Sequence, residues 1–163
     1  MNLKTIKKLA MFFLSATLLT TVVFYLPARA AEQAPDFTLP SLNGTMVSLN
    51  QFKGQKPVLV EFFATWCHFC RAIHPQIVKL RESVPESKLA IVAIDVGSGD
   101  SLERVKLYVK NHPSPFTVLY DKGSIVTRTY GVEGIPHIVL VDKNGNIKYQ
   151  GSELPSDPMS LVQ

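Results

Sequence analysis

Outside its first 30 positions, the 163-residue chain has no excess of charge of either sign. It contains 17 basic and 13 acidic residues, a net charge of +4, and four of the basic residues lie in the first 30 positions, namely Lys4, Lys7, Lys8 and Arg29. Without these four, 13 basic residues face 13 acidic residues. A domain of zero net charge gives no support for nucleic-acid binding, since such proteins concentrate positive charge on one face.

The first 30 residues also lack any acidic side chain. Their three lysines are followed by an uncharged run of 18 residues from Leu9 to Leu26 and by the sequence Pro27-Ala28-Arg29-Ala30. This order is typical of a secretory signal cleaved after Ala30. Because a run of this length can just span a bilayer, an uncleaved membrane anchor is the alternative. In both cases the lysines stay inside, so the globular part is expected in a periplasmic or other extracytoplasmic compartment.

Residues 31–163 contain no internal repeat and no low-complexity tract. Their number suits one domain with a single core. Buried strands are expected at 57–64 and 89–96, and a shorter strand at 116–120. Two hairpins are expected, one joining 36–39 to 46–49 and one joining 137–142 to 146–150. This order of elements, with helices between the strands, predicts an α/β sandwich with a mixed sheet.

Three helical segments are expected between these strands. The first begins at Cys67, contains Pro75, which should kink it, and carries an inward stripe at spacings of four and three. That predicted stripe consists of Phe69, Ile73, Ile77, Leu80 and Val84. The second begins with Asp100 and Glu103 in a capping-box-like pattern, and the third is a turn around 124–130.

Cysteine is scarce: the only two are Cys67 and Cys70, in the segment ATWCHFCRAIHP, residues 64–75. A disulfide between them would close a ring so small that it stabilises the fold by only about 2 kcal/mol, against nearly 5 kcal/mol for a ring of about a hundred residues. A domain with two long buried strands does not depend on so small a constraint. A purely structural disulfide is therefore the weaker interpretation.

Histidine is scarce as well, and its spacing argues against a closed zinc site. His68 and His74 share the helix of the cysteines, while His112 and His137 lie 25 residues apart. No pair has the short spacing of zinc-finger ligands. A looser copper site built from Cys67, Cys70 and one histidine stays open, because thiolates select Cu(I).

The position of the cysteines favours redox chemistry. Cys67 falls where a buried strand gives way to a helix, and the amide groups and dipole of a helix start lower the pKa of a thiol there. Cys70 lies one turn further into the helix, where it can resolve a mixed disulfide. A Cys-x-x-Cys after a strand in such a pattern is a fairly specific redox signal.

Three segments give the chain a resemblance to a known family: PVLVEFFATWCHFCRAIHP (57–75), GIPHIVLVDKNGNI (134–147) and APDFTLPSLNG (34–44). They resemble the thioredoxin superfamily and, more narrowly, the exported TlpA/ResA-like thiol–disulfide oxidoreductases. The resemblance implies a thioredoxin-like fold, a mixed central sheet flanked by helices, with an N-terminal β-hairpin extension. Nearly all of residues 31–163 are covered.

The resemblance also implies roles for individual residues. Cys67 attacks, Cys70 resolves, and Trp66 flanks the site and contacts the substrate. The Ile135-Pro136 peptide is implied to be cis and to align the substrate backbone beside the disulfide. Without the resemblance, a trans peptide would be expected, because only about 5–6% of X–Pro bonds in folded proteins are cis.

The function implied is disulfide reduction in exported proteins, as in cytochrome c maturation, with electrons from a membrane thiol carrier. The redox-active Cys67–Cys70 disulfide is the only cofactor expected, and no metal. His68-Phe69 between the cysteines is unusual for the family and leaves the redox direction open, so a disulfide oxidant is one alternative. A copper-binding module on the same fold is another. Peroxiredoxins share the Ala-Pro-Asp-Phe opening, but they need a proline and a threonine placed ahead of a single cysteine. Here Thr65 is two residues before Cys67 and no proline precedes it within the motif, so peroxidase activity is the weakest alternative.

Two further side chains are candidates. Glu61 lies in the middle of a strand expected to be buried, which should raise its pKa and allow it to exchange a proton with Cys70; an exposed position on an edge strand is the alternative. His68 could stabilise the Cys67 thiolate as a cation, but a cation in the first turn opposes the helix dipole. A solvated surface histidine is the other interpretation of His68.

Overall fold

The computed structural model describes residues 32–162, so the predicted leader, residues 1–30, lies outside the described part. Within 32–162 no helix is long and apolar enough to cross a membrane. The elements are, in chain order, β1 (Thr38–Pro40), β2 (Met46–Ser48), the 3-10 helix η1 (Leu49–Phe52), β3 (Val58–Phe63), α2 (His68–Ser83), β4 (Ala90–Asp95), α3 (Leu102–Asn111), β5 (Thr117–Tyr120), α4 (Ile125–Thr129), β6 (His137–Val141), β7 (Ile147–Gly151) and α5 (Pro158–Val162).

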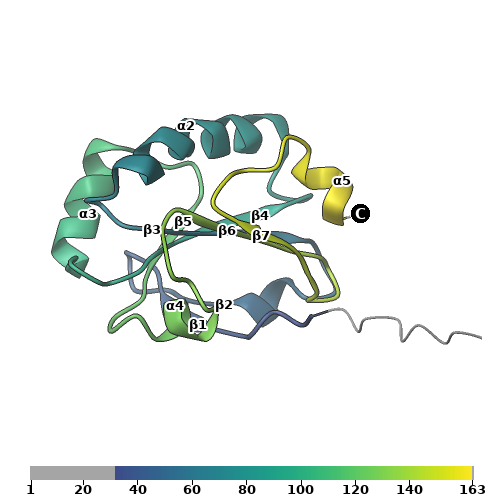
Figure 1. The fold of residues 1–163 in the computed structure, drawn as a ribbon, viewed down its shortest axis with the longest axis horizontal. Helices are drawn as coiled ribbons and strands as arrows, with labels where there is room; N and C mark the ends of the chain where they lie inside the picture. The colour runs from purple at the N-terminus through teal and green to yellow at the C-terminus, as the bar shows by residue number, and fades with distance from the viewer. Residues whose placement is uncertain (1–31, 163) are drawn as a thin grey trace, which may run out of the picture. The chain divides into compact units, whose positions relative to one another are not determined.

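Five strands form the central sheet in the order β5-β4-β3-β6-β7. β3, β4 and β5 are parallel, while β6 and β7 are antiparallel to their neighbours. β1 and β2 pair separately as a small antiparallel hairpin. In Figure 1, α2, α3 and α5 cover one face of the central sheet, and α4 lies with β1 and β2 on the other. The predicted fold, a mixed α/β sandwich with an N-terminal hairpin, is confirmed; only η1 had no signal that we recognised.

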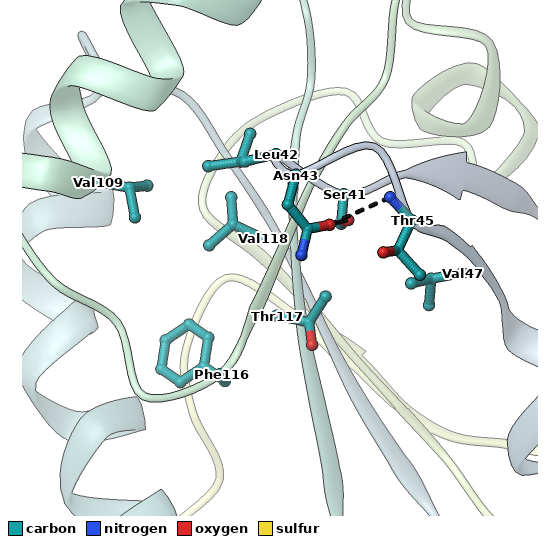
Figure 2. Close-up of a pocket in the computed structure, with 9 residues that line it drawn as sticks. All are labelled: Ser41, Leu42, Asn43, Thr45, Val47, Val109, Phe116, Thr117 and Val118. Carbon is teal, nitrogen blue, oxygen red and sulfur yellow. Dashed lines mark hydrogen bonds between the residues drawn. The ribbon is translucent and has the colours of Figure 1, made fainter.

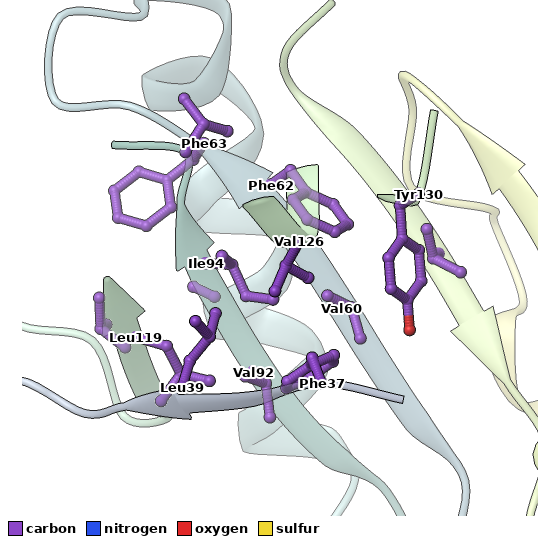
Figure 3. Packing of buried hydrophobic residues seen from close by; sticks show 14 of the residues in the cluster. Phe37, Leu39, Val60, Phe62, Phe63, Val92, Ile94, Leu119, Val126 and Tyr130 are labelled. Carbon is purple, nitrogen blue, oxygen red and sulfur yellow. The ribbon is translucent and has the colours of Figure 1, made fainter. Parts of the chain in front are cut away.

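The core is divided by the central sheet into two apolar layers. Every residue of β3 and β4 is buried, because these strands lie between the layers and neighbouring side chains point to opposite faces. Figure 3 shows the layer on the hairpin side, where Phe37 and Leu39 pack with Val60, Phe62 and Tyr130. The opposite layer joins the sheet to α2 and α5 and contains Leu59, Ile73, Ile77, Ile138 and Val162.

The inward face of α2 differs from the predicted stripe at its first position. Phe69 is 72% exposed, and Cys70 is buried instead, in line with Ile73 and Ile77. The physical reason is the helical spacing: residues 70, 73 and 77 follow intervals of three and four and share one face, so residue 69 falls on the flank. Pro75 lies inside the helix as predicted.

The start of α3 also differs from the prediction. Ser101, not Asp100, caps the helix, since its side chain accepts a hydrogen bond from the Arg104 amide at 3.2 Å. Serine and aspartate are both good capping residues, and the pattern could not distinguish between neighbours. Asp100 is thereby released from capping and makes other contacts, described below.

The C-terminal helix is short but anchored. It begins at Pro158, because proline suits the first position of a helix. Asp157 Oδ1 accepts a hydrogen bond from the Ser160 amide at 3.2 Å. Pro158 and Val162 are buried, so α5 adds to the apolar layer beneath α2 despite its length of five residues.

Candidate active site

Cys67 and Cys70 form a disulfide at the junction between β3 and α2. Cys67 is the capping residue of α2, and its Sγ accepts a hydrogen bond from the Cys70 amide at 3.0 Å. When the disulfide is opened, the same amide and the helix dipole stabilise negative charge on this sulfur. The geometry therefore gives Cys67 the environment of an attacking thiolate and leaves Cys70 inside the helix.

Neither cysteine exposes much surface: 4% of Cys67 and 3% of Cys70 are accessible. Their neighbours Trp66 and Phe69 are 55% and 72% exposed. An incoming thiolate therefore meets the disulfide over a small area flanked by two aromatic side chains.

The chain segment before β6 lies against the disulfide. The Ile135-Pro136 peptide is cis, as the resemblance implies, and the Ile135 carbonyl oxygen is 3.7 Å from Cys67 Sγ. A disulfide sulfur has no hydrogen to donate, so this is a van der Waals contact that could become a weak hydrogen bond only in the reduced thiol. Beside it, a hollow of about 450 Å³ is lined by Phe69, Ile135, Pro136 and the 152–154 segment.

Glu61 lies behind the disulfide in the central strand of the sheet. β3 has β4 on one side and β6 on the other, so the alternative of an exposed edge position is wrong. Burial raises the pKa of Glu61 to about 8, since a charged carboxylate is poorly solvated there. Glu61 and Cys70 line one small cavity, which brings the predicted proton-exchange pair together.

Three further polar side chains, those of His74, Tyr108 and Ser114, line the same cavity and had not been predicted to take part. His74 is half-buried, and burial followed by the charge of His112 lowers its pKa; its Nε2 is 3.4 Å from Ser114 Oγ. The second is Tyr108, from α3, whose pKa is raised mainly by burial. His74 could have been found, because a residue four positions after Cys70 shares its helix face. Tyr108 had no signal, because its approach depends on how α3 packs.

Trp66 and His68, the remaining candidates, are both exposed. The Trp66 indole N–H donates a hydrogen bond to the Ser98 carbonyl at 3.0 Å, which fixes the ring to the segment after β4. His68 is the first residue of α2, and its ring meets the Phe69 ring edge-on, with 6.0 Å between centroids. This position is compatible with either role considered for His68.

A second hollow, of about 390 Å³, lies between the β1–β2 turn and β5 (Figure 2). Its side chains include Leu42, Asn43, Thr45 and Phe116, and none of the residues that line it carries a thiol, an imidazole or a carboxyl group. Across residues 32–162, no three His, Cys, Asp or Glu side chains are grouped as metal ligands. The disulfide with its cavity is therefore the site that we consider.

Comparisons with known proteins find relatives whose names refer to thiol-disulfide oxidoreductases or to thioredoxin. The thiol-disulfide oxidoreductase ResA of Bacillus thuringiensis subsp. konkukian is 35% identical over 116 residues, which are 71% of this chain and 65% of ResA, so the chain spans just under two thirds of that relative. The thioredoxin-like protein YneN of Bacillus subtilis is 37% identical over 121 residues, 74% of this chain and 69% of YneN.

Among solved structures, the thioredoxin domain of a thiol-disulfide oxidoreductase from Bacteroides vulgatus superposes with a TM-score of 0.70 and 30% identity, over 82% of this chain and 97% of that domain. The model of the AhpC/TSA family matches residues 30–150. The chain therefore has a thioredoxin-like fold and belongs to the AhpC/TSA family.

Proposed function

We propose that the protein is an extracytoplasmic thiol–disulfide oxidoreductase that exchanges its Cys67–Cys70 disulfide with cysteine pairs of exported proteins. The observation that carries this proposal is the position of the disulfide, with Cys67 Sγ accepting the Cys70 amide at the start of α2. The names of the relatives ResA and the Bacteroides vulgatus oxidoreductase support the same activity. The leader pattern of residues 1–30 supports the location outside the cytoplasm.

In the reducing direction, the Cys67 thiolate attacks a disulfide of the substrate and releases one substrate thiolate. The Cys70 thiolate then attacks Cys67 Sγ, which closes the protein's disulfide and releases the second substrate thiol. Two electrons pass from the protein to the substrate. Cys70 must first lose its proton, and ionised Glu61, in the same cavity, is the group that accepts it.

The resemblance favours a reductant of the cytochrome c maturation type, supplied with electrons by a membrane thiol carrier. The proposal needs no cofactor beyond the disulfide itself. We assign substrate contact to three residues: Trp66 is exposed next to the disulfide, the Ile135 carbonyl contacts Cys67 Sγ, and Pro136 lines the hollow beside it.

Trapping a mixed disulfide tests the proposed activity. Reduced Cys70→Ser protein mixed with a disulfide-containing peptide should accumulate a covalent adduct through Cys67, because the resolving thiol is absent. The matched Cys67→Ser protein should accumulate none, and mass spectrometry measures both. A wild-type protein that fails to cycle with dithiothreitol, or an adduct formed only by Cys67→Ser, would contradict the assigned roles.

The reduction potential of the Cys67–Cys70 pair decides whether the protein reduces or oxidises its substrates. Related proteins range from about −270 mV for thioredoxin to about −120 mV for a strong oxidant, roughly 7 kcal/mol apart for two electrons. Equilibration of the Cys67–Cys70 pair with glutathione or dithiothreitol should give a value toward the reducing end. A value near the oxidising end would make the protein an oxidant, and stoichiometric copper in the purified reduced protein would favour a metal-binding module instead.

A further inference from the structure

The segment that follows β4 holds the two residues that precede Cys67. Asp100 accepts two hydrogen bonds from Thr65: Oδ2 from the backbone amide at 2.8 Å and Oδ1 from the hydroxyl at 2.6 Å. The Trp66 indole donates to the Ser98 carbonyl nearby. The Asp100 side chain has no exposed surface. The approach to Cys67 is therefore fixed by a loop 35 residues further along the chain.

Asp95, the last residue of β4, lies next to Asp100 and is fully buried. Its Oδ1 accepts a hydrogen bond from the Gly97 amide at 2.9 Å. Its Oδ2 is buried with no N–H or O–H donor in reach among residues 32–162. The neighbouring polar group is the Asp100 carboxyl, and two carboxyl groups can form a hydrogen bond only when one of them carries a proton.

Of the two carboxyl groups, Asp95 is the one whose surroundings favour the protonated form. Burial raises its pKa to about 7, the Gly97 amide opposes this rise, and the charges of Asp100 and Asp121 add to it. Asp100, by contrast, uses both oxygens as acceptors for Thr65. A protonated Asp95 Oδ2 therefore donates to a carboxylate whose position is already set by Thr65.

We propose that Asp95 and Asp100 share one proton, and that this carboxyl pair positions Thr65 and Trp66, and through them Cys67, for disulfide exchange. Both are positioning residues, because neither touches the sulfur atoms. The effect on exchange rests on the proposed function, whereas the arrangement of Thr65 and Trp66 does not.

The charges around the carboxyl pair explain why loss of its proton should weaken the contacts to Thr65. The other ionisable groups around the pair come from β5, the β5–α4 turn and α3: Tyr120, Asp121 and Arg104, with the charge of Glu103 acting on Tyr120. Only Arg104 is positive, and its exposed side chain stands 3.7 Å from Asp100 Oδ1. Loss of the proton places a second negative charge in this acidic surrounding, so the carboxyl groups repel each other and the contacts to Thr65 weaken.

Trp66 is the only tryptophan of the chain, so intrinsic fluorescence reports directly on this region. In the oxidised wild-type protein we expect one fluorescence transition near neutral pH. Asp95→Asn should abolish it, because the amide keeps the shape of the side chain and can donate to Asp100 at every pH. Glu103→Gln, which removes a nearby exposed charge, and His68→Ala, which removes the adjacent imidazole, should both retain the transition.

A second measurement follows the connection from Asp100 to Thr65. Asp100→Ala and Thr65→Val should each shift the Trp66 emission and slow reduction by dithiothreitol roughly tenfold, since small displacements of reacting groups strongly reduce rates. The double variant should be no slower than the slower single variant, because both changes remove the same interaction, the one between residues 65 and 100. Thr65→Ser, which keeps the hydroxyl, should restore the wild-type emission.

Several results would overturn the inference: a wild-type protein without the transition, a transition that persists in Asp95→Asn or vanishes in His68→Ala, or fully additive effects of Asp100→Ala and Thr65→Val. The fluorescence experiment uses the oxidised protein and needs no exchange. A protein that shows the transition but cannot exchange disulfides would therefore refute the proposed function and leave the carboxyl pair in place.

Discussion

Glu61 is a carboxyl group that the fold tolerates because it can stay protonated. Its pKa of about 8 leaves most of the population uncharged at neutral pH, which avoids burying a full charge. The ionised minority can accept a proton from Cys70 within the shared cavity. A group with a pKa near the working pH is well suited to donate and accept protons in turn.

Glu61→Gln should therefore slow disulfide exchange much more than it harms folding. Glutamine has nearly the same shape but cannot accept the Cys70 proton, and acid–base catalysis typically contributes on the order of 10²-fold or more to a rate. Stopped-flow measurement of peptide disulfide reduction gives the rate, and urea unfolding gives the stability.

Glu82→Gln is the matched control, because Glu82 is an exposed residue near the end of α2 and its loss should leave the rate unchanged. Equal rates for Glu61→Gln and the wild type would remove Glu61 from the reaction.

Single functional residues could be predicted where neighbours in the sequence determine their surroundings. The cysteines and Glu61 could be identified from their places in an apolar run and at a strand–helix junction. Asp95 carries the same signal, an acid in the apolar run LAIVAIDV (89–96), and it was missed because no cysteine lies near it in sequence. Its connection to Thr65 depends on a contact between distant segments, which periodicity cannot reveal.

Among the helices, α4 depends most clearly on one side chain. It has only five residues, and helices this short are not stable by themselves in water. Asp121 is buried just before it and accepts hydrogen bonds from the amides of Ile125, Val126 and Thr127 and from the Thr127 hydroxyl, at 2.7–3.3 Å. This carboxylate satisfies the amide groups that a helix start leaves without partners.

Asp121→Ala should lower the free energy of unfolding by about 2–4 kcal/mol, because hydrogen bonds to a charged group contribute about 1.5–3 kcal/mol and a lost helix cap about 1 kcal/mol. Urea unfolding followed by circular dichroism measures the change. Lys122→Ala, at the exposed neighbouring position, should alter it by less than about 0.5 kcal/mol. A similar loss in both variants would show that the cap does not stabilise α4.

Elements were predicted well where the apolar pattern was continuous, as in β3 and β4. The predictions were wrong where two neighbouring residues fitted the same rule. Residues 69 and 70 both fit the spacing of α2, and Asp100 and Ser101 both fit a helix cap. Cys70 is the residue that packs in the core, and Asp100 bonds to Thr65 and does not cap α3.

For the whole molecule, two buried acids set the dependence of stability on pH. The pKa of Glu61 rises from 4.5 to about 8, and that of Asp95 from 3.8 to about 7. Between these values the folded state holds protons that the unfolded state has released. Stability is therefore greatest below the unfolded pKa values and falls as pH rises through this window. Asp142 has the opposite sign, because hydrogen bonds from Asn146 and Asn144 lower its pKa despite its burial, but it acts only in acid. His74 also opposes the fall, because burial lowers its pKa from 6.5 and the unfolded state is then the more protonated one.

The oxidised protein should therefore lose stability between about pH 5 and pH 8, with Glu61 contributing on the order of 4 kcal/mol as an upper bound. Urea midpoints at both pH values measure the loss. Glu61→Gln combined with Asp95→Asn should flatten the profile, because neither amide titrates. A double variant that retains the full wild-type slope would assign the pH dependence to other groups.

The direction of the strands has a practical consequence for work on this protein. The ends of β3, β4 and β5 and the beginning of β6 all lie at one rim of the sheet, because Phe63 pairs with Asp95, Asp95 with Tyr120, and Phe62 with His137. The disulfide, the carboxyl pair and the cap of α4 share that rim. The opposite rim, where exposed residues 85–88 precede β4, is the place for a fluorophore, an affinity tag or a surface tether that leaves the redox chemistry undisturbed.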